Sequence, residues 1–186
     1  MKRPFDFLFA SVLLAIFCVP AIVIMLIVKL TSKGTIIYWS DRVGKNNLIF
    51  KMPKFRTMKI DTPELATHLL ENSTDVITPI GNFLRKYSLD EIPQLWSILK
   101  GDMSFVGPRP ALFNQNDLIR LRTEYGVEKI LPGLTGWAQV NGRDDLDIIE
   151  KVERDSEYLA KQSFLFDLKI LWYTFLRVIK KDGVSH

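Results

Sequence analysis

Cysteine and histidine are almost missing from this chain of 186 residues, whose length suits one domain, or one domain with an appendage. The single cysteine, Cys18, lies within an apolar segment, so no disulfide can form inside the chain, as is typical of a reducing compartment. The two histidines, His68 and His186, are isolated from each other in sequence. This inventory argues against a cysteine and histidine zinc site and against a catalytic triad that uses histidine.

Acidic residues are scarce between residues 29 and 59, where Asp41 is the only one. The same stretch holds eight basic residues: Lys29, Lys33, Arg42, Lys45, Lys51, Lys54, Arg56 and Lys59. The whole chain has a net charge of +4. Such a basic belt suits an anionic membrane surface or a phosphorylated substrate. It would also suit nucleic acid, but no nucleic-acid-binding motif accompanies it, so we expect no nucleic-acid partner.

Charges are also rare in residues 5–28, an apolar segment interrupted by Asp6, Ser11 and Pro20. As a helix, it would be about 36 Å long, enough to cross a hydrocarbon core of roughly 30 Å. It is too long for a cleaved signal peptide, and no small-residue cleavage site follows it. Asp6 has the spacing to pair with Lys2 or Arg3 on the same helix.

The topology of this segment stays open on physical grounds. Pro20 leaves the carbonyl of Ile16 without its helical donor and predicts a kink or break. Basic residues flank the segment on both sides, so the positive-inside bias gives no orientation. A helix that spans the membrane and one that enters and returns to the same face are both compatible with this pattern.

The rest of the chain predicts an α+β fold that is mostly helical. Residues 35–39 and 48–50 read as two strands of a small β-hairpin with a turn at 42–47. Lys54 and Arg56 follow on one face of an extended segment. Helices are expected at 61–78 (short, followed by a loop), 79–86, 90–100, 111–125, 146–161 and 164–181. The last is amphipathic and suits either the core or a membrane interface.

The stretch from Lys86 to Leu95 places two adjacent carboxylates, Asp90 and Glu91, at the start of a predicted helix. With Asp90 as N-cap, Pro93 takes the third helical position and Gly101 ends the helix. A capping box formed by Ser88 and Glu91 is the alternative start. Acidic residues at a helix N-terminus are favoured by the helix dipole. Ordinary helix capping therefore explains Asp90 and Glu91 as well as a catalytic role does.

Two further motifs suit phosphate binding. In Gly107-Pro108-Arg109-Pro110, the prolines stiffen the turn, which lowers the entropy cost when Arg109 grips an anion. Residues 132–143 form a glycine-punctuated loop whose backbone could approach a ligand or form an anion nest. The alternative for residues 107–110 is a rigid connector with an exposed arginine, and the alternative for residues 132–143 is an ordinary connecting loop.

Taken in order, these motifs resemble the bacterial sugar transferase family, the monotopic phosphoglycosyl transferases. The similarity extends over essentially the whole chain. It rests on Lys2-Arg3-x-x-Asp6, Lys54-Phe55-Arg56-Thr57-Met58, Ser88-Leu89-Asp90-Glu91-Ile92-Pro93-Gln94-Leu95, Leu99-Lys100-Gly101-Asp102-Met103-Ser104, Gly107-Pro108-Arg109-Pro110, Pro132-Gly133-Leu134-Thr135-Gly136 and Gln139-Val140-Asn141-Gly142-Arg143.

The resemblance implies a UDP-sugar:undecaprenyl-phosphate sugar-1-phosphate transferase that releases UMP through a covalent aspartyl-phosphosugar intermediate. By matching positions, Asp90 would be the nucleophile and, with Glu91, would bind Mg2+. Phosphate-binding residues would be Lys54, Arg56, Arg85, Arg109 and Arg143. The resemblance also implies a re-entrant membrane helix over residues 1–33 and a catalytic domain over residues 34–186, on the cytoplasmic face of the bacterial inner membrane. Amphipathic interfacial helices would surround the active site.

The resemblance leaves several points open. Relatives commonly carry serine before the helix-breaking proline, whereas Val19 stands there in this chain. A homo-oligomer is compatible with the sequence. A non-catalytic membrane-associated adaptor, which would use the apolar segment and the basic belt, is the alternative function.

Overall fold

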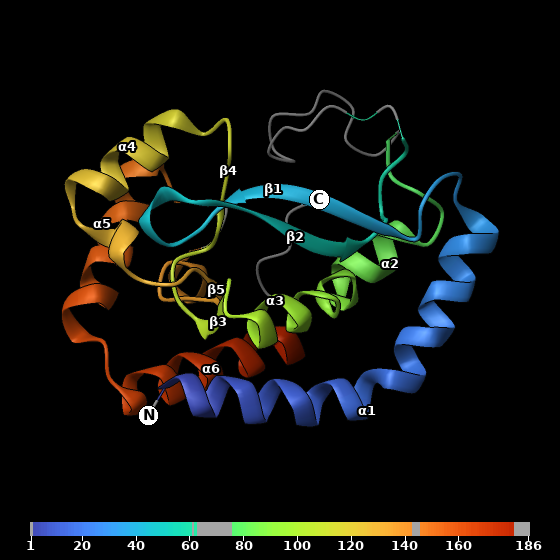
Figure 1. The fold of residues 1–186 in the computed structure, drawn as a ribbon, viewed down its shortest axis with the longest axis horizontal. Helices are drawn as coiled ribbons and strands as arrows, with labels where there is room; N and C mark the ends of the chain where they lie inside the picture. Colours follow the sequence, from blue (N-terminus) through green and yellow to red (C-terminus); the bar gives the residue numbers. More distant parts are fainter. Residues whose placement is uncertain (1, 61, 63–75, 143–145, 181–186) are drawn as a thin grey trace.

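The computed structural model describes residues 2–60, 62, 76–142 and 146–180 and has an α+β fold rich in helix, as predicted (Figure 1). The helices are α1 (Lys2–Thr31), α2 (Gly81–Lys86), α3 (Gln94–Lys100), α4 (Asn116–Glu124), α5 (Ile148–Lys161) and α6 (Phe164–Lys180), with 3-10 helices η1 (Lys45–Asn47), η3 (Leu89–Glu91), η4 (Val127–Lys129) and η5 (Gln139–Asn141). The strands are β1 (Ile37–Val43), β2 (Ile49–Phe55), β3 (Ser104–Val106), β4 (Ala111–Leu112) and β5 (Gly133–Thr135).

The predicted β-hairpin is confirmed, and its strands are longer than the sequence indicated. β1 pairs antiparallel with β2 along its whole length and with β4 on its other side. Arg42, predicted to begin the turn, lies in β1 opposite Phe50. The chain reverses through η1, where Asn46 and Asn47 adopt left-handed conformations (φ 55° and 58°) that asparagine tolerates better than most residues. The longer β2 includes Lys54, whose backbone position is therefore fixed by the sheet.

β3 and β5 form a second, parallel sheet whose ends pass very close to each other. A Cβ atom on Gly133 would lie 2.1 Å from the nitrogen of Gly107, and one on Gly136 would lie 2.1 Å from the oxygen of Gly107. The Gly107 N–H donates to the Thr135 carbonyl at 2.9 Å. The close approach that these glycines permit is thus made to the protein's own backbone, next to the turn that carries Arg109.

α1 continues through Pro20 as one helix, so of the predicted alternatives, a kink or a break, the structure shows the kink (Figure 1). The two halves of α1 point in different directions (Figure 1). Proline removes one N–H donor and crowds the carbonyl of Ile16, a single defect that bends a long helix without ending it. Among the helices described, α1 alone is long and apolar enough to cross a membrane, with a mean hydropathy of 3.0. Its exposed apolar side chains are Phe7, Leu8, Val12, Ile16, Val19, Ile22, Val23, Leu26, Ile27 and Leu30.

The N-terminus of α1 is fastened by Lys2, whose ammonium group can donate three hydrogen bonds. Its acceptors are the Val106 carbonyl oxygen (2.9 Å), the Tyr158 hydroxyl (2.9 Å) and Asp167 Oδ2 (2.5 Å). The Tyr158 hydroxyl in turn donates to Asp167 Oδ1 at 2.7 Å. Burial, followed by the contact with Asp167, raises the pKa of Tyr158, so this hydroxyl stays protonated and keeps its donor role.

Asp6 and Arg3 bind the body of the protein rather than each other. Asp6 is 2% exposed and accepts a hydrogen bond from the Phe105 N–H at 3.2 Å. The predicted pairing of Asp6 with its neighbouring lysine or arginine is therefore wrong. Arg3 donates to the carbonyl oxygens of Ile98 and Leu99, the latter at 2.8 Å. Carbonyls in the last turn of a helix lack helical partners, so Arg3 caps α3.

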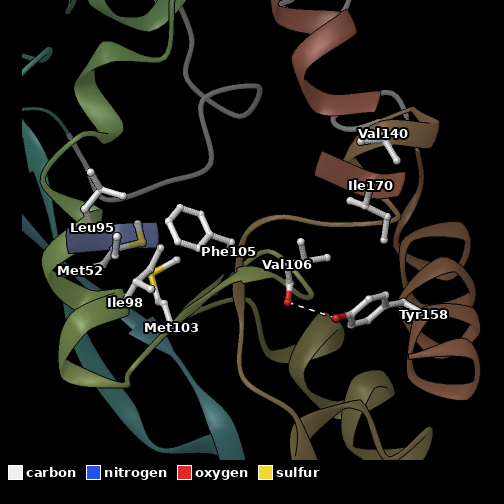
Figure 2. Close-up of a cluster of buried hydrophobic side chains, with 10 residues drawn as sticks. Met52, Leu95, Ile98, Met103, Phe105, Val106, Val140, Tyr158 and Ile170 are labelled. Atoms are coloured by element: carbon white, nitrogen blue, oxygen red, sulfur yellow. Dashed lines mark hydrogen bonds between the residues drawn. The ribbon is translucent and has the colours of Figure 1, made fainter. Parts of the chain in front are cut away.

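Apolar packing attaches both halves of α1 to the same body. From the first half, Ala10 enters the main core cluster, which also includes Met52, Leu95, Ile98, Met103, Phe105, Val106, Val140, Tyr158 and Ile170. Figure 2 shows β3 passing between the α3 side chains of this cluster and those of α5 and α6. From the second half, Ile24 and Val28 pack with Phe55 of β2 and Leu84 of α2.

Most of the other helices that the sequence predicted are present in the structure. The expected helices at 79–86, 146–161 and 164–181 are α2, α5 and α6, and α5 begins after a capping box between Asp147 and Glu150. The helix predicted at 111–125 begins only at Asn116, because residues 111 and 112 pair with β1 as β4. The prediction for residues 61–78 falls almost entirely outside the described residues. α6 contributes Ile170, which is fully buried, to the core, whereas its Trp172 is 57% exposed; the membrane interface stays a prediction for this helix.

We expect Gly133→Ala to destabilise the fold by about 3 kcal/mol or more, because overpacking against rigid backbone cannot relax. Its Cβ would lie 2.1 Å from the Gly107 nitrogen and 2.4 Å from the Thr135 oxygen. Gly44→Ala is the matched control, since its nearest neighbours would be a flexible ring atom of Phe50 at 3.1 Å and the Leu48 oxygen at 3.2 Å. Thermal unfolding in lipid nanodiscs measures both variants, and equal losses would contradict this account.

Candidate active site

The two carboxylates of the central stretch lie in η3, a tight turn that precedes α3. Ser88 adopts a left-handed conformation (φ 54°) and caps nothing through its side chain, so neither predicted helix start is right. The Glu91 N–H donates to the Ser88 carbonyl at 3.2 Å, a bond between residues three apart. Pro93 (φ −61°) is the N-cap of α3, so the helix begins after the proline rather than including it in its first turn. The predicted end at Gly101 is confirmed, with φ 99°.

Asp90 and Glu91 meet a cation from the β-hairpin. Asp90 is 6% exposed, and Lys54 Nζ from β2 lies 3.7 Å from Asp90 Oδ2. The same ammonium group donates to Glu91 Oε1 at 2.8 Å. The side chains of Lys54 and Glu91 are 17% and 13% exposed, so water screens this pair only in part. Lys54 therefore joins the two carboxylates to the sheet.

A second cation reaches the same carboxylate from the proline-flanked turn. Arg109 Nη2 lies 3.2 Å from Glu91 Oε1 and donates a hydrogen bond to it. Its side chain is 34% exposed, so the guanidinium is accessible from outside. Glu91 Oε1 thus accepts from Lys54 and from Arg109, two cations that are 55 positions apart in the sequence and meet only in the fold.

The charge state of Asp90 is set by opposing influences. Burial is the largest and raises the pKa of Asp90, the Lys54 ammonium lowers it, and the neighbouring Glu91 carboxylate raises it again. Arg85 and Arg109 also lower it. The net result is a raised pKa, so ionised Asp90 is a buried carboxylate of increased basicity surrounded by cations. A carboxylate must be ionised to react as a nucleophile, and Lys54, Arg85 and Arg109 favour that form against the effect of burial.

The structure brings together some of the predicted phosphate-binding residues and separates others. Lys54 and Arg109 contact the carboxylates, and Arg85, near the end of α2, acts on Asp90 through its charge. Arg56 is turned elsewhere: it donates to the Thr35 carbonyl at 2.7 Å and lies over the ring of Tyr38. Its guanidinium holds the start of the hairpin. The structure therefore does not support grouping it with the others.

Arg143, also predicted to bind phosphate, falls outside the described residues, so the structure does not test that prediction.

Two arginines near the site were missed by the sequence analysis. Arg122 of α4 donates to the Arg109 carbonyl oxygen at 2.8 Å, and Arg42 of β1 donates to the Pro110 carbonyl oxygen at 3.1 Å. Arg122 also binds Asp155 of α5. Neither arginine belongs to a motif, and each contact joins distant parts of the chain, so no local signal marks them.

Asp90 and Glu91 are compatible with a magnesium ion. Carboxylate oxygens are the protein ligands that Mg2+ prefers, and it is often held by one or two carboxylates with substrate phosphates completing its shell. The described residues contain no cluster of three or more carboxylate, histidine or cysteine ligands. The pair therefore fits a metal that arrives with its substrate better than a metal held entirely by protein.

The fold and this site define an α+β protein with a charged, partly buried centre attached to a membrane-length helix. The chain matches the family described as bacterial sugar transferase over residues 1–181, and it belongs to that family.

Individual relatives agree with this assignment. The chain is 40% identical to the UDP-glucose:undecaprenyl-phosphate glucose-1-phosphate transferase of Escherichia coli strain K12, over 94% of this chain and 39% of that protein. It is 38% identical to the uncharacterized sugar transferase EpsL of Bacillus subtilis strain 168, over 100% of this chain and 90% of that protein. It is 37% identical to the exopolysaccharide production protein ExoY of Rhizobium meliloti strain 1021, over 98% and 87%. The chain thus spans about two fifths of the Escherichia coli protein and most of the other two.

We expect Asp90→Asn to stabilise the protein at neutral pH. Because the folded-state pKa of Asp90 is raised, its contribution to stability is complete below its unfolded pKa, about 3.9, and is lost as the pH rises through the folded value. Asparagine does not ionise, so the variant does not lose stability as the pH rises. Lys54 keeps Glu91 as its partner. The melting temperature of the variant should therefore exceed that of the wild type by a margin that grows from about pH 4 and then levels off.

Thermal unfolding in nanodiscs across this pH range tests the expectation. Asp41→Asn, in β1 and paired with Lys51 through side chains that are 39% and 67% exposed, is the control and should show no such pH-dependent gain. A lower melting temperature for Asp90→Asn at neutral pH would contradict the raised pKa.

Proposed function

We propose that this protein is a phosphoglycosyl transferase that moves a sugar 1-phosphate from a UDP-sugar to undecaprenyl phosphate and releases UMP. The observation that carries this proposal is the buried Asp90 carboxylate bordered by Lys54 and by the Arg109–Glu91 pair. Phosphoryl transfer depends mainly on positioning and on charge stabilisation, and this site supplies cations from three separate elements. The activity for which the Escherichia coli relative is named supports the same reaction class.

In the proposed reaction, an Asp90 carboxylate oxygen attacks the β-phosphorus of the UDP-sugar. A bond forms between that oxygen and phosphorus, the bond from phosphorus to the bridging oxygen breaks, and UMP leaves with the bonding electrons. An oxygen of undecaprenyl phosphate then attacks the same phosphorus. The aspartyl–phosphorus bond breaks, which regenerates the Asp90 carboxylate and forms the undecaprenyl diphosphate sugar.

The neighbouring residues have distinct roles in this proposal. Lys54 stabilises the ionised Asp90 in the resting state and the phosphate charge during transfer, because it lies near both carboxylates. Arg109, more exposed than Lys54, is the cation that meets incoming phosphate. Glu91 holds both cations in place. Asp90 and Glu91 would hold Mg2+, which would supply further charge neutralisation.

We also propose that α1 is re-entrant and that the protein lies on the cytoplasmic face of the bacterial inner membrane. The support is that both halves of α1 pack on one body: Lys2 binds Asp167 near the N-terminus, and Val28 packs with Phe55 near the other end. A straight span would place the two ends on opposite sides of a hydrocarbon core roughly 30 Å thick. The exposed apolar side chains of α1 would then face lipid.

A membrane-associated adaptor without activity is the alternative, favoured by the apolar surface of α1 alone. It does not explain why Asp90 is kept buried with a raised pKa, an arrangement that reduces stability at neutral pH. Functional sites are where such costs are expected.

We expect Asp90→Asn to lower UMP release at least about a thousandfold, the scale seen when a nucleophile is removed. A panel of UDP-sugars with undecaprenyl phosphate and Mg2+ measures release and also reveals the transferred sugar. Mass spectrometry of the wild type incubated with the active UDP-sugar, without acceptor, should find a phosphosugar adduct on Asp90. Asp41→Asn should retain release. Unchanged release by Asp90→Asn would rule out Asp90 as the nucleophile, and no release from any donor would favour the adaptor.

For the topology, we expect both ends of α1 to be labelled from the cytoplasmic side only. The background is Cys18→Ser, with one cysteine either added before Met1 or introduced as Lys33→Cys, so the contacts of Lys2 stay intact. A membrane-impermeant maleimide should label both variants in inverted vesicles and neither in intact spheroplasts. Labelling of the two ends from opposite sides would establish a spanning helix instead.

A further inference from the structure

The backbone of the turn that carries Arg109 is held at three consecutive carbonyl groups. The Pro108 oxygen accepts from the Gly133 N–H at 2.9 Å. The Arg109 oxygen accepts from Arg122 Nη1 at 2.8 Å, and the Pro110 oxygen accepts from Arg42 Nη1 at 3.1 Å. Because the two prolines have no N–H groups, the carbonyls are the main hydrogen-bonding groups through which this turn can be fixed.

Arg122 is itself firmly held. Its Nε and Nη2 atoms donate to Asp155 Oδ2 at 3.0 and 2.6 Å. The side chains of Arg122 and Asp155 are 12% and 1% exposed, so this ion pair is buried between α4 and α5. With two of its nitrogens occupied by Asp155, the planar guanidinium can present Nη1 in only one direction, toward the Arg109 carbonyl.

A small space of about 30 Å³ lies behind the turn, and Pro108, Ala111, Arg122 and Ile130 are among its lining residues. A space of that size has room for about one water molecule, so the packing around the Arg122 side chain is incomplete there. The hydrogen bonds to the three carbonyls therefore add to the packing that holds the Arg109 backbone in place.

We propose that Arg122, oriented by Asp155, is a positioning residue that acts on the reaction through Arg109; this rests on the proposed function. Arg122 contacts the backbone of Arg109, whereas the Arg109 side chain contacts Glu91 at the site. A carbonyl held at 2.8 Å fixes the origin of the side chain, and catalysis is sensitive to displacements of about 1 Å, which cost on the order of a hundredfold. Asp155 and Arg122 thus link α4 and α5 to phosphate binding.

The test removes the contact without leaving a buried charge unpaired. In the double variant Arg122→Met/Asp155→Leu, apolar side chains replace the ion pair, a change that buried pairs often tolerate without loss of stability. We expect kcat/KM for the UDP-sugar to fall about tenfold to a hundredfold, while the melting temperature stays near that of the wild type. Arg120→Gln on the same helix, whose side chain is 68% exposed and pairs with Glu124, is the control and should keep its activity.

A thermodynamic cycle with Arg109→Gln separates positioning from a general loss of structure. If Arg122 acts through Arg109, adding Arg122→Met/Asp155→Leu to the Arg109→Gln variant should lower kcat/KM by less than about threefold. The reason is that the effects of residues acting as a unit do not add. The full loss in the Arg109→Gln background would overturn the inference, and so would an Arg109→Gln variant with wild-type kcat/KM. Absence of UMP release from the unsubstituted protein would instead contradict the proposed function itself.

Discussion

The burial of one carboxylate, Asp90, is the constraint around which the site is built. A carboxylate that is 6% exposed is unfavourable when ionised, and cations must lie close to it to keep the charged form accessible. They come from separate parts of the chain: Lys54 from β2, Arg85 from α2 and Arg109 from the proline-flanked turn. Glu91 makes this convergence possible, since one of its oxygens accepts from Lys54 and Arg109 together.

The position of the turn that carries Arg109 depends on three glycines. Gly107 can lie against Gly133 and Gly136 only because none of them has a Cβ, and this contact joins β3 to β5. Gly133 and Gly136, which the sequence analysis placed in a loop suited to a ligand, bring two backbone segments together, and Arg109 lies two residues after Gly107. The phosphate-binding role proposed for Arg109 therefore depends on glycines that make no proposed contact with phosphate.

Features encoded by neighbouring residues were predictable, and those set by distant contacts were not. The hairpin, the end of α3 at Gly101 and the helix over residues 148–161 follow from local patterns. The start of α4 was misjudged because β4 pairs with a strand about seventy residues earlier, beyond any local window. Arg122 was missed because its partner Asp155 lies on another helix. Motif resemblance grouped Lys54, Arg109 and Arg56, and only the tertiary structure shows that the first two meet at Glu91 whereas Arg56 contacts Thr35.

The alternation of apolar and charged residues also explains how the membrane-length helix and the site are joined. The charged residues of the site have apolar sequence neighbours that pack against the second half of α1. These neighbours are Phe55 beside Lys54, Leu84 beside Arg85, and Leu89 and Ile92 on either side of the Asp90–Glu91 pair. Each apolar side chain that α1 binds thereby fixes the backbone of a neighbouring charged residue. A displacement of α1 would move these backbones together, so the helix is a structural part of the site. Under the proposed function, the reacting carboxylate is then held at a fixed position relative to the lipid in which its acceptor is anchored.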